Sequence, residues 1–112
     1  MTDARQFNIR DEEGRTICPA CGFPNYAYRD AYTERGGLIG VTICPACFWE
    51  PGFDDHQLAS AAAKDTIMES LHAYRAEWSK TLEWRGYEER KPDNWDAKQH
   101  LDRLFELAPH LR

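Results

Sequence analysis

The 112-residue sequence has no long hydrophobic run, which excludes a membrane-spanning helix. Its first residues, Met-Thr-Asp-Ala-Arg, also lack the apolar stretch of a signal peptide, so we expect a cytoplasmic protein. No low-complexity tract is present, and hydrophobic residues make up 42% of the chain. That fraction is enough for a buried core and argues against disorder. The length predicts one domain.

Basic charge is also scarce, because the formal net charge is −5. The basic residues form only two small clusters, Arg29 with Arg35 and Arg85 with Arg90-Lys91. Binding to a phosphate backbone by counterion release needs a concentrated basic patch. The composition therefore disfavours nucleic acid as a partner.

Recognised catalytic motifs are absent as well. The sequence has no nucleophile elbow, Ser/His/Asp arrangement or glycine-rich phosphate loop. The run Asp54-Asp55-His56 contains acid and base groups, but such runs more often form a solvated cap. The other histidines, His72, His100 and His110, have no partner motif, and we expect them on helix surfaces. We therefore predict that the protein is not an enzyme.

All four cysteines occur in two copies of one tetrapeptide, Cys18-Pro19-Ala20-Cys21 and Cys44-Pro45-Ala46-Cys47. The full pattern is C-x2-C-x22-C-x2-C. Each C-x-x-C turn presents two sulfurs from one side, and an intervening hairpin can bring the two turns around one ion. We therefore predict that Cys18, Cys21, Cys44 and Cys47 bind a structural Zn²⁺, which accepts four thiolates without redox chemistry.

Other interpretations of the cysteines stay open at this point. Two disulfides would need an oxidising compartment. Reduced, unliganded thiols would leave the paired spacing unexplained. A rubredoxin-like iron site is the closest rival, because Cys21-Gly22-Phe23 resembles one of its turns, whereas Cys47-Phe48-Trp49 lacks the usual glycine. A zinc ion held by four thiolates would bring the net charge to about −7.

The predicted fold class is α+β: a small rubredoxin-like zinc ribbon followed by two α-helices. Residues 1–56 would form the zinc-ribbon module, and residues 57–112 a helical extension packed on it within one structural domain. Alternating tyrosines predict a strand over residues 26–32, and β-branched residues predict its partner over 38–43. Residues 33–37 form the expected turn, and 7–9 a further short strand. So short a ribbon needs the metal to fold.

Apolar residues at helical spacing predict a helix from about Gln57 to Arg85, with a break allowed near residues 60–64. Asp54 or Asp55 would cap its start and Gly86 would end it. Asp93 or Asn94 would cap a second helix that ends at Pro109. We expect Phe48 and Trp49 to cover the metal and seat the helix. Trp84, off the apolar stripe, is the candidate for an exposed anchor, although the sequence does not settle whether Trp49 and Trp84 are core or exposed.

The second knuckle and its flanks, residues 43–50 (ICPACFWE), resemble a signature of the bacterial cysteine-rich CPCC domain family, and residues 18–23 (CPACGF) resemble its first knuckle. The resemblance covers roughly residues 15–90, with Asp54-Asp55 in place of the acids after the second knuckle and residues 71–85 in place of the helix. The family's extra cysteine is Ala20 in this chain, and the hairpin is longer. The resemblance implies a zinc-ribbon module without established enzymatic activity.

Together these observations favour a small zinc-binding module that interacts with a protein partner. A sharper hypothesis is that it neutralises a basic partner, as acidic immunity or antidote proteins do. One alternative is a regulatory nucleic-acid-binding ribbon that uses Arg29 and Arg35. Another is a redox or metal sensor that uses its thiolates.

Overall fold

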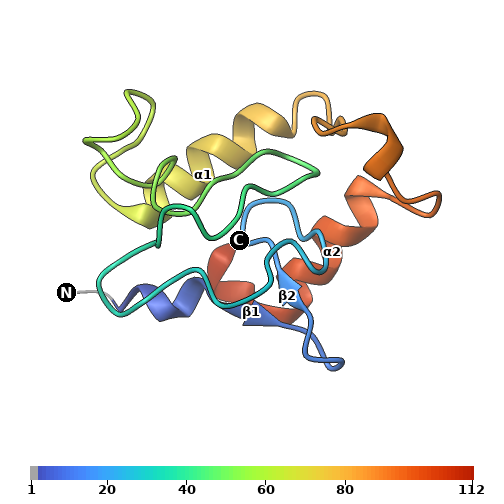
Figure 1. Cartoon of the computed structure of the whole chain (residues 1–112), viewed down its shortest axis with the longest axis horizontal. Helices are drawn as coiled ribbons and strands as arrows, with labels where there is room; N and C mark the ends of the chain where they lie inside the picture. The colour runs from blue at the N-terminus through green and yellow to red at the C-terminus, as the bar shows by residue number, and fades with distance from the viewer. Residues whose placement is uncertain (1–2) are drawn as a thin grey trace.

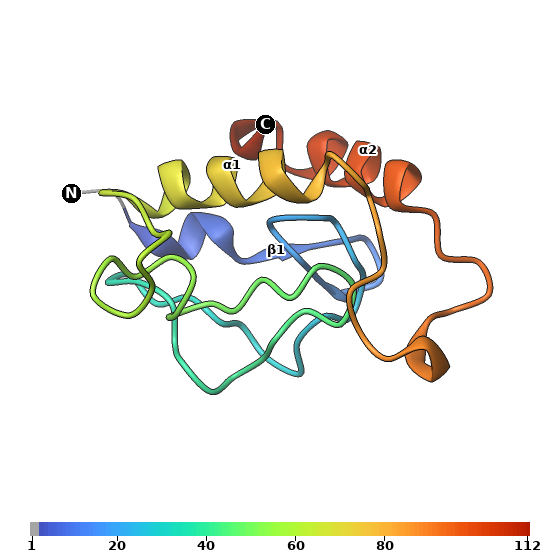
Figure 2. The same ribbon diagram turned by 90° about the horizontal axis from the view of Figure 1, so that it is seen from above.

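Two α-helices lie on one side of the molecule, and long irregular loops lie on the other (Figure 2). Figure 1 shows the same chain with its helices and strands labelled. The computed structural model describes residues 3–112. The helices and strands are β1 (Ile9–Arg10), β2 (Thr16–Ile17), α1 (Ile67–Trp78) and α2 (Ala97–Leu107). Short 3₁₀ turns occupy Ala4–Phe7, Glu88–Arg90 and Pro109–Leu111. The fold is α+β, as the sequence predicts.

The two strands form an antiparallel hairpin that leads the chain into the first cysteine pair. Ile9 pairs with Ile17 and Arg10 with Thr16. The Asp11 carboxylate accepts hydrogen bonds from the backbone N–H of Glu13 and Arg15, which closes the turn between the strands. The strand predicted over residues 7–9 begins only at Ile9, because Phe7 belongs to a 3₁₀ turn.

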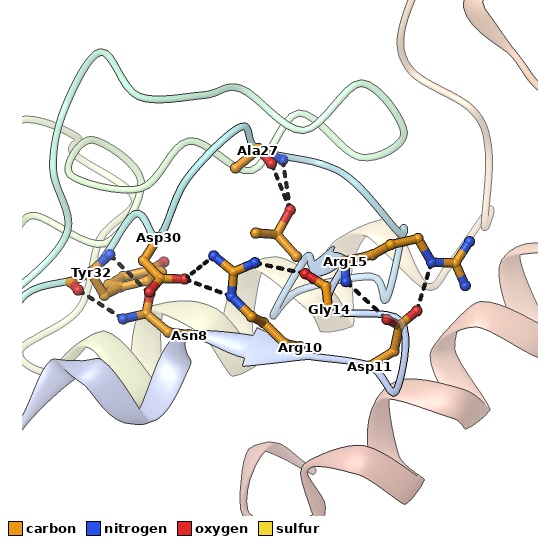
Figure 3. Close-up of polar contacts among 9 residues, drawn as sticks. Asn8, Arg10, Asp11, Gly14, Arg15, Ala27, Asp30 and Tyr32 are labelled. Atoms are coloured by element: carbon orange, nitrogen blue, oxygen red, sulfur yellow. Dashed lines mark hydrogen bonds and ion pairs between the residues drawn. The ribbon is translucent and has the colours of Figure 1, made fainter.

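The strand predicted over residues 26–32 is wrong, because side chains rather than a backbone ladder hold this segment. Figure 3 shows that the Asn8 amide both donates to the carbonyl of Tyr32 (2.8 Å) and accepts from its N–H (3.0 Å). The Thr16 hydroxyl likewise bonds to both backbone groups of Ala27, and Arg10 binds Asp30. These bonds satisfy the backbone locally, so no strand forms.

The predicted partner strand over residues 38–43 is also wrong, although the turn before it is confirmed. Thr33 and Gly36 are hydrogen-bonded across that turn, and Tyr32 forms one isolated bridge with Gly37. Beyond the bridge, Gly40 takes the left-handed conformation (φ +85°) and bends the chain. Gly37 lies so close to Gly52 that an added Cβ would stand 2.4 Å from its nitrogen, so this segment packs against residues 51–55 instead of a strand.

The first helix is much shorter than predicted. It begins at Ile67, where Thr66 and Glu69 form a reciprocal cap: the Thr66 hydroxyl accepts from the Glu69 N–H and donates to its carboxylate. The preceding residues 57–66 form turns and bury little, with Leu58 91% exposed, so no packing stabilises a helix there. The helix ends at Trp78, and Leu82 then adopts a left-handed conformation.

The caps predicted from aspartate positions need two corrections. Asp54 and Asp55 bond to the N–H groups of Glu50 and Gly52, so they close a turn and cap no helix. The second helix is capped by Asp96, whose carboxylate accepts from the Gln99 N–H (3.1 Å), and not by Asp93 or Asn94. Its end just before Pro109 agrees with the prediction.

The buried residues form one hydrophobic cluster that includes the four cysteines. Residues of the N-terminal turn, the second knuckle, both helices and the C-terminal segment contribute to it: Ala4, Phe7, Trp49, Leu71, Trp78, Leu104, Ala108 and Leu111. Neither helix within residues 3–112 is long and apolar enough to span a bilayer.

Leu104 is fully buried in this cluster, and its truncation tests the described packing. We expect Leu104→Ala to lower the free energy of unfolding by about 2–5 kcal/mol, since it leaves a cavity. The matched control is Leu58→Ala, at a residue that is 91% exposed. It should change stability by no more than about 0.5 kcal/mol. Urea denaturation of both variants measures the difference, and equal effects would contradict the described core.

Candidate metal centre

The four cysteine sulfurs converge on one point inside the core. All four residues are buried, and their Sγ atoms lie within 4.8 Å of one another. The Sγ atoms of Cys18 and Cys47 are 3.8 Å apart, and those of Cys21 and Cys44 are 3.7 Å apart. Sulfurs at the corners of a regular tetrahedron around an ion about 2.3 Å away would be separated by about 3.8 Å. The cluster therefore has the dimensions of a tetrahedral thiolate site and can hold a metal ion.

Two turns with the same hydrogen-bond pattern present the sulfurs. In the first, the Cys18 N–H donates to the carbonyl of Phe23 (3.0 Å), and the Gly22 N–H donates to the carbonyl of Cys18 (2.9 Å). In the second, Cys44 bonds in the same way to Trp49 (2.9 Å) and Phe48 to Cys44 (2.8 Å). The repeated tetrapeptide thus builds the same local structure twice, and each turn directs two sulfurs inward.

The residue after each cysteine pair adopts a left-handed backbone conformation. Gly22 has φ +87° and Phe48 has φ +69°. Glycine takes this conformation without a steric penalty, whereas a residue with a Cβ pays about 1–2 kcal/mol. The second knuckle therefore keeps the required turn geometry with a strained phenylalanine, although its sequence lacks the glycine.

Trp49 lies at the centre of the packing around the second knuckle. It is fully buried, its indole N–H donates to the hydroxyl of Tyr32 (2.8 Å), and its ring meets Tyr74 of α1 edge to face. The Tyr74 hydroxyl in turn donates to the carbonyl of Cys47 (2.7 Å). Trp49 thus seats α1 against the site as expected. Phe48, in contrast, is 47% exposed and is not part of the buried cluster around the sulfurs.

Arg75 of α1 places a buried positive charge beside the first knuckle. Its guanidinium donates to the carbonyls of Pro19 (2.6 Å), Ala20 (2.8 Å) and Leu111 (2.6 Å). Burial lowers the pKa of Arg75, while the nearby cysteine thiolates oppose that shift. No carboxylate within residues 3–112 pairs with this cation. Negative charge on the sulfurs is therefore its electrostatic counterpart.

Sequence reasoning missed Arg75, although one signal was available. Leu71, Arg75 and Trp78 lie at positions i, i+4 and i+7, so the arginine stands on the buried face of the helix. An arginine inside an apolar stripe indicates a buried polar partner.

The loop after α1 docks on the second knuckle. The Arg85 N–H donates to the carbonyl of Ala46 (2.8 Å), and a Cβ at Gly86 would stand 2.3 Å from the carbonyl oxygen of Pro45. Gly86 therefore permits a close backbone contact and does not end the helix as predicted. Trp84 is half-buried, with its ring edge to face against Phe23 and Trp95, so it is not the exposed anchor expected from the sequence.

The environment of the sulfurs does not favour four negative charges without a cation. Burial raises the pKa of Cys21 and of Cys47 well above the usual thiol value, and hydrogen bonding to Cys18 adds to the effect. Burial also acts to raise the pKa of Cys18, but hydrogen bonds from the other three cysteines outweigh it and lower that pKa. Metal binding would have to displace the remaining protons.

The other candidate residues do not join the cysteine cluster. Burial raises the pKa of Asp54 and of Asp55, whose carboxylates bond to backbone N–H groups. His100 is half-buried against Phe23, not on the surface as expected, while His72 and His110 are exposed. Arg85 is held by Cys47 and Tyr74, so its predicted basic cluster is not a free patch.

No known protein family, curated protein or solved structure matches this chain. These comparisons therefore give no support to an assignment to the CPCC domain family.

The two left-handed positions allow a paired test of the knuckle geometry. Phe48→Gly relieves the strain but loses a half-buried ring, so we expect stability within about 1 kcal/mol of wild type. Gly22→Ala keeps the left-handed φ and adds a Cβ 2.1 Å from the carbonyl oxygen of His100. That variant should lose about 2 kcal/mol or more. Thermal unfolding of both variants, loaded with metal in the same way, measures the two losses of stability. Equal losses would contradict the turn geometry that the two knuckles share.

Removing the Arg75 guanidinium should destabilise the first knuckle. Arg75→Met leaves the buried carbonyls of Pro19 and Ala20 without their donor, and we expect a loss of about 3 kcal/mol or more in unfolding free energy. Arg112→Met is the matched control, because both guanidinium groups lie over the Phe105 ring, at 4.9 and 5.4 Å from its centroid. The control removes only an exposed cation–π contact worth about 0.5–1 kcal/mol. Similar losses in both variants would contradict the assigned role.

Proposed function

We propose that Cys18, Cys21, Cys44 and Cys47 bind one Zn²⁺ ion that stabilises a small protein-interaction module. The observation that carries the proposal is the convergence of four buried sulfurs within 4.8 Å of one another, with the Cys18–Cys47 and Cys21–Cys44 pairs at 3.8 and 3.7 Å. These are the separations that four zinc-bound thiolates require. All four cysteines are free thiols in the structure, which argues against two disulfides.

Zinc is preferred over iron because it takes tetrahedral thiolate sites as a structural ion and needs no redox partner. An ion with a double positive charge and four thiolates forms a centre of charge −2. The buried guanidinium of Arg75 supplies nearby compensation for that charge and also hydrogen-bonds two carbonyls of the first knuckle. The residues present therefore fit a tetrathiolate centre.

The ion would have a structural role. Four thiolates fill the tetrahedral coordination sphere, so no position is open for water or substrate. The two knuckles join segments that share no extended sheet, since the described strands have two residues each. Without the ion, little else would close this half of the molecule. We therefore propose a binding role and not catalysis.

A protein partner suits the charge better than a nucleic acid. The chain carries a net charge of −5 before the contribution of the metal centre. Arg29 and Arg35 are exposed, but two arginines alone give little counterion release. A sensor that reacts through its thiolates is also less well supported, because the buried sulfurs are shielded from oxidants. A basic protein, as in immunity or antidote pairs, fits the overall charge.

Metal content and a ligand substitution test the zinc centre. Protein purified without added zinc should contain one zinc per chain, and cobalt-substituted protein should show the absorption of tetrahedral thiolate coordination. We expect Cys44→Ser to lose zinc and the ordered knuckles while retaining much of the helical circular dichroism, because α1 and α2 lie outside the knuckles. Metal-free protein whose circular dichroism and tryptophan emission equal those of the metal-loaded protein would contradict the proposal. Iron in place of zinc would change only the identity of the proposed ion.

A salt series tests the basic partner. Immobilised zinc-loaded protein should retain its partner at low salt and lose affinity as salt rises, since screening weakens charge attraction. Failure to retain any protein at either salt level would count against a protein-interaction role, and retention of duplex DNA in its place would favour the nucleic-acid alternative.

A further inference from the structure

An open, mostly apolar groove lies beside the second knuckle, with a volume of about 450 Å³. Large exposed hydrophobic side chains line it: Ile43, Phe48, Phe53 and Tyr87. They account for four of the seven such side chains within residues 3–112. Scattered exposed apolar residues need no explanation, but a contiguous group around a hollow is typical of a binding surface.

The backbone strain at Phe48 lies in the wall of this groove. Gly22 occupies the equivalent position of the first knuckle with no side chain and no strain. At the second knuckle the chain holds a phenylalanine in the left-handed conformation, and that ring is 47% exposed. The cost of this conformation is thus comparable to what a half-exposed ring can contribute to the core. Strain of this kind is common at ligand-binding positions. Its placement is best explained by a contact made outside the chain.

Charges at the rim of the groove define the chemistry of the partner. Glu50 and Asp54 line it, and within residues 3–112 neither side chain forms an ion pair. The Asp54 carboxylate is partly buried, and that burial raises its pKa. Among the residues that the structure describes, its one hydrogen-bond partner is the Glu50 N–H. A cation from a partner would stabilise both carboxylates, and the neighbouring thiolate centre would add negative potential.

Arg90 lies on the rim of the same groove and is likewise without an ion pair within residues 3–112. An extended peptide offers backbone carbonyls that such a guanidinium can bind, while a nucleic acid would bring phosphates towards Glu50 and Asp54. The combination of an aromatic-lined hollow, two carboxylates and one arginine matches a peptide anchor site.

We propose that this groove binds an extended peptide segment in which a bulky apolar residue stands next to lysine or arginine. The apolar side chain would enter between Phe48 and Tyr87, and the basic side chain would pair with Glu50 and Asp54. This inference rests on the proposed protein-interaction function and names its surface and the chemistry of its partner.

A display library of short random peptides tests the proposal on zinc-loaded protein. We expect enriched peptides to pair an aromatic or aliphatic residue with a lysine or arginine within two positions. Tyr87→Ser, at a side chain that is 69% exposed, should weaken binding of the enriched peptide by about tenfold or more. Tyr28→Ser is the matched control, since Tyr28 is 79% exposed and does not line the groove, and it should bind as wild type.

Two further measurements separate the contribution of charge to peptide binding from nonspecific hydrophobic binding. Glu50→Gln should weaken the peptide several-fold and reduce the salt dependence of its binding, while Phe48→Gly should weaken binding without loss of bound zinc. Absence of enrichment, acidic consensus peptides, equal effects of Tyr28→Ser and Tyr87→Ser, or preferential binding of a single-stranded oligonucleotide would each overturn the proposal. Zinc content is measured on every sample, so loss of the metal centre is distinguished from failure of the groove.

Discussion

The structure depends on the meeting of four sulfurs at a single buried point. They come from two turns whose hydrogen bonds repeat, and residues from every part of the fold pack around them. Tyr74 and Arg75 reach the knuckles from α1, and Arg85 reaches them from the loop that follows. With only two-residue strands to organise the N-terminal half, regular backbone pairing contributes little. Side-chain packing around the sulfurs therefore takes the place of regular backbone pairing in the described part of this half.

The convergence of the four cysteines was predictable because C-x-x-C turns encode their own geometry. The turn at residues 33–37 was predictable too, since glycines mark it. The conformation of the segments on either side of that turn was not predictable. Alternation of tyrosines indicates a half-buried extended segment. It does not indicate whether the backbone of that segment is hydrogen-bonded by a neighbouring strand or by side chains. Here Asn8 and Thr16, far away in sequence, bond to the backbone of Tyr32 and Ala27.

The helix errors have a different physical origin. Ala59 to Ala63 have strong helix propensity, yet nothing packs on them, and isolated short helices are marginal in water. The Thr66–Glu69 cap is a local signal that outweighs propensity and starts the helix at Ile67. Gly86 was interpreted by its commonest role, the end of a helix, whereas a tertiary approach to Pro45 is what requires it. Such contacts become visible only when both segments are placed together.

The close backbone contacts at Gly22 and Gly86 also bear on how relatives of this chain can be recognised. Each glycine faces a carbonyl oxygen, of His100 and of Pro45 respectively, at a distance that admits no side chain. A homologue that shares the fold is expected to carry glycine at both places, even where loop lengths and helix surfaces have diverged. A search profile that joins those two glycines to the paired cysteines would discriminate better than the cysteines alone, which many unrelated metal-binding turns share.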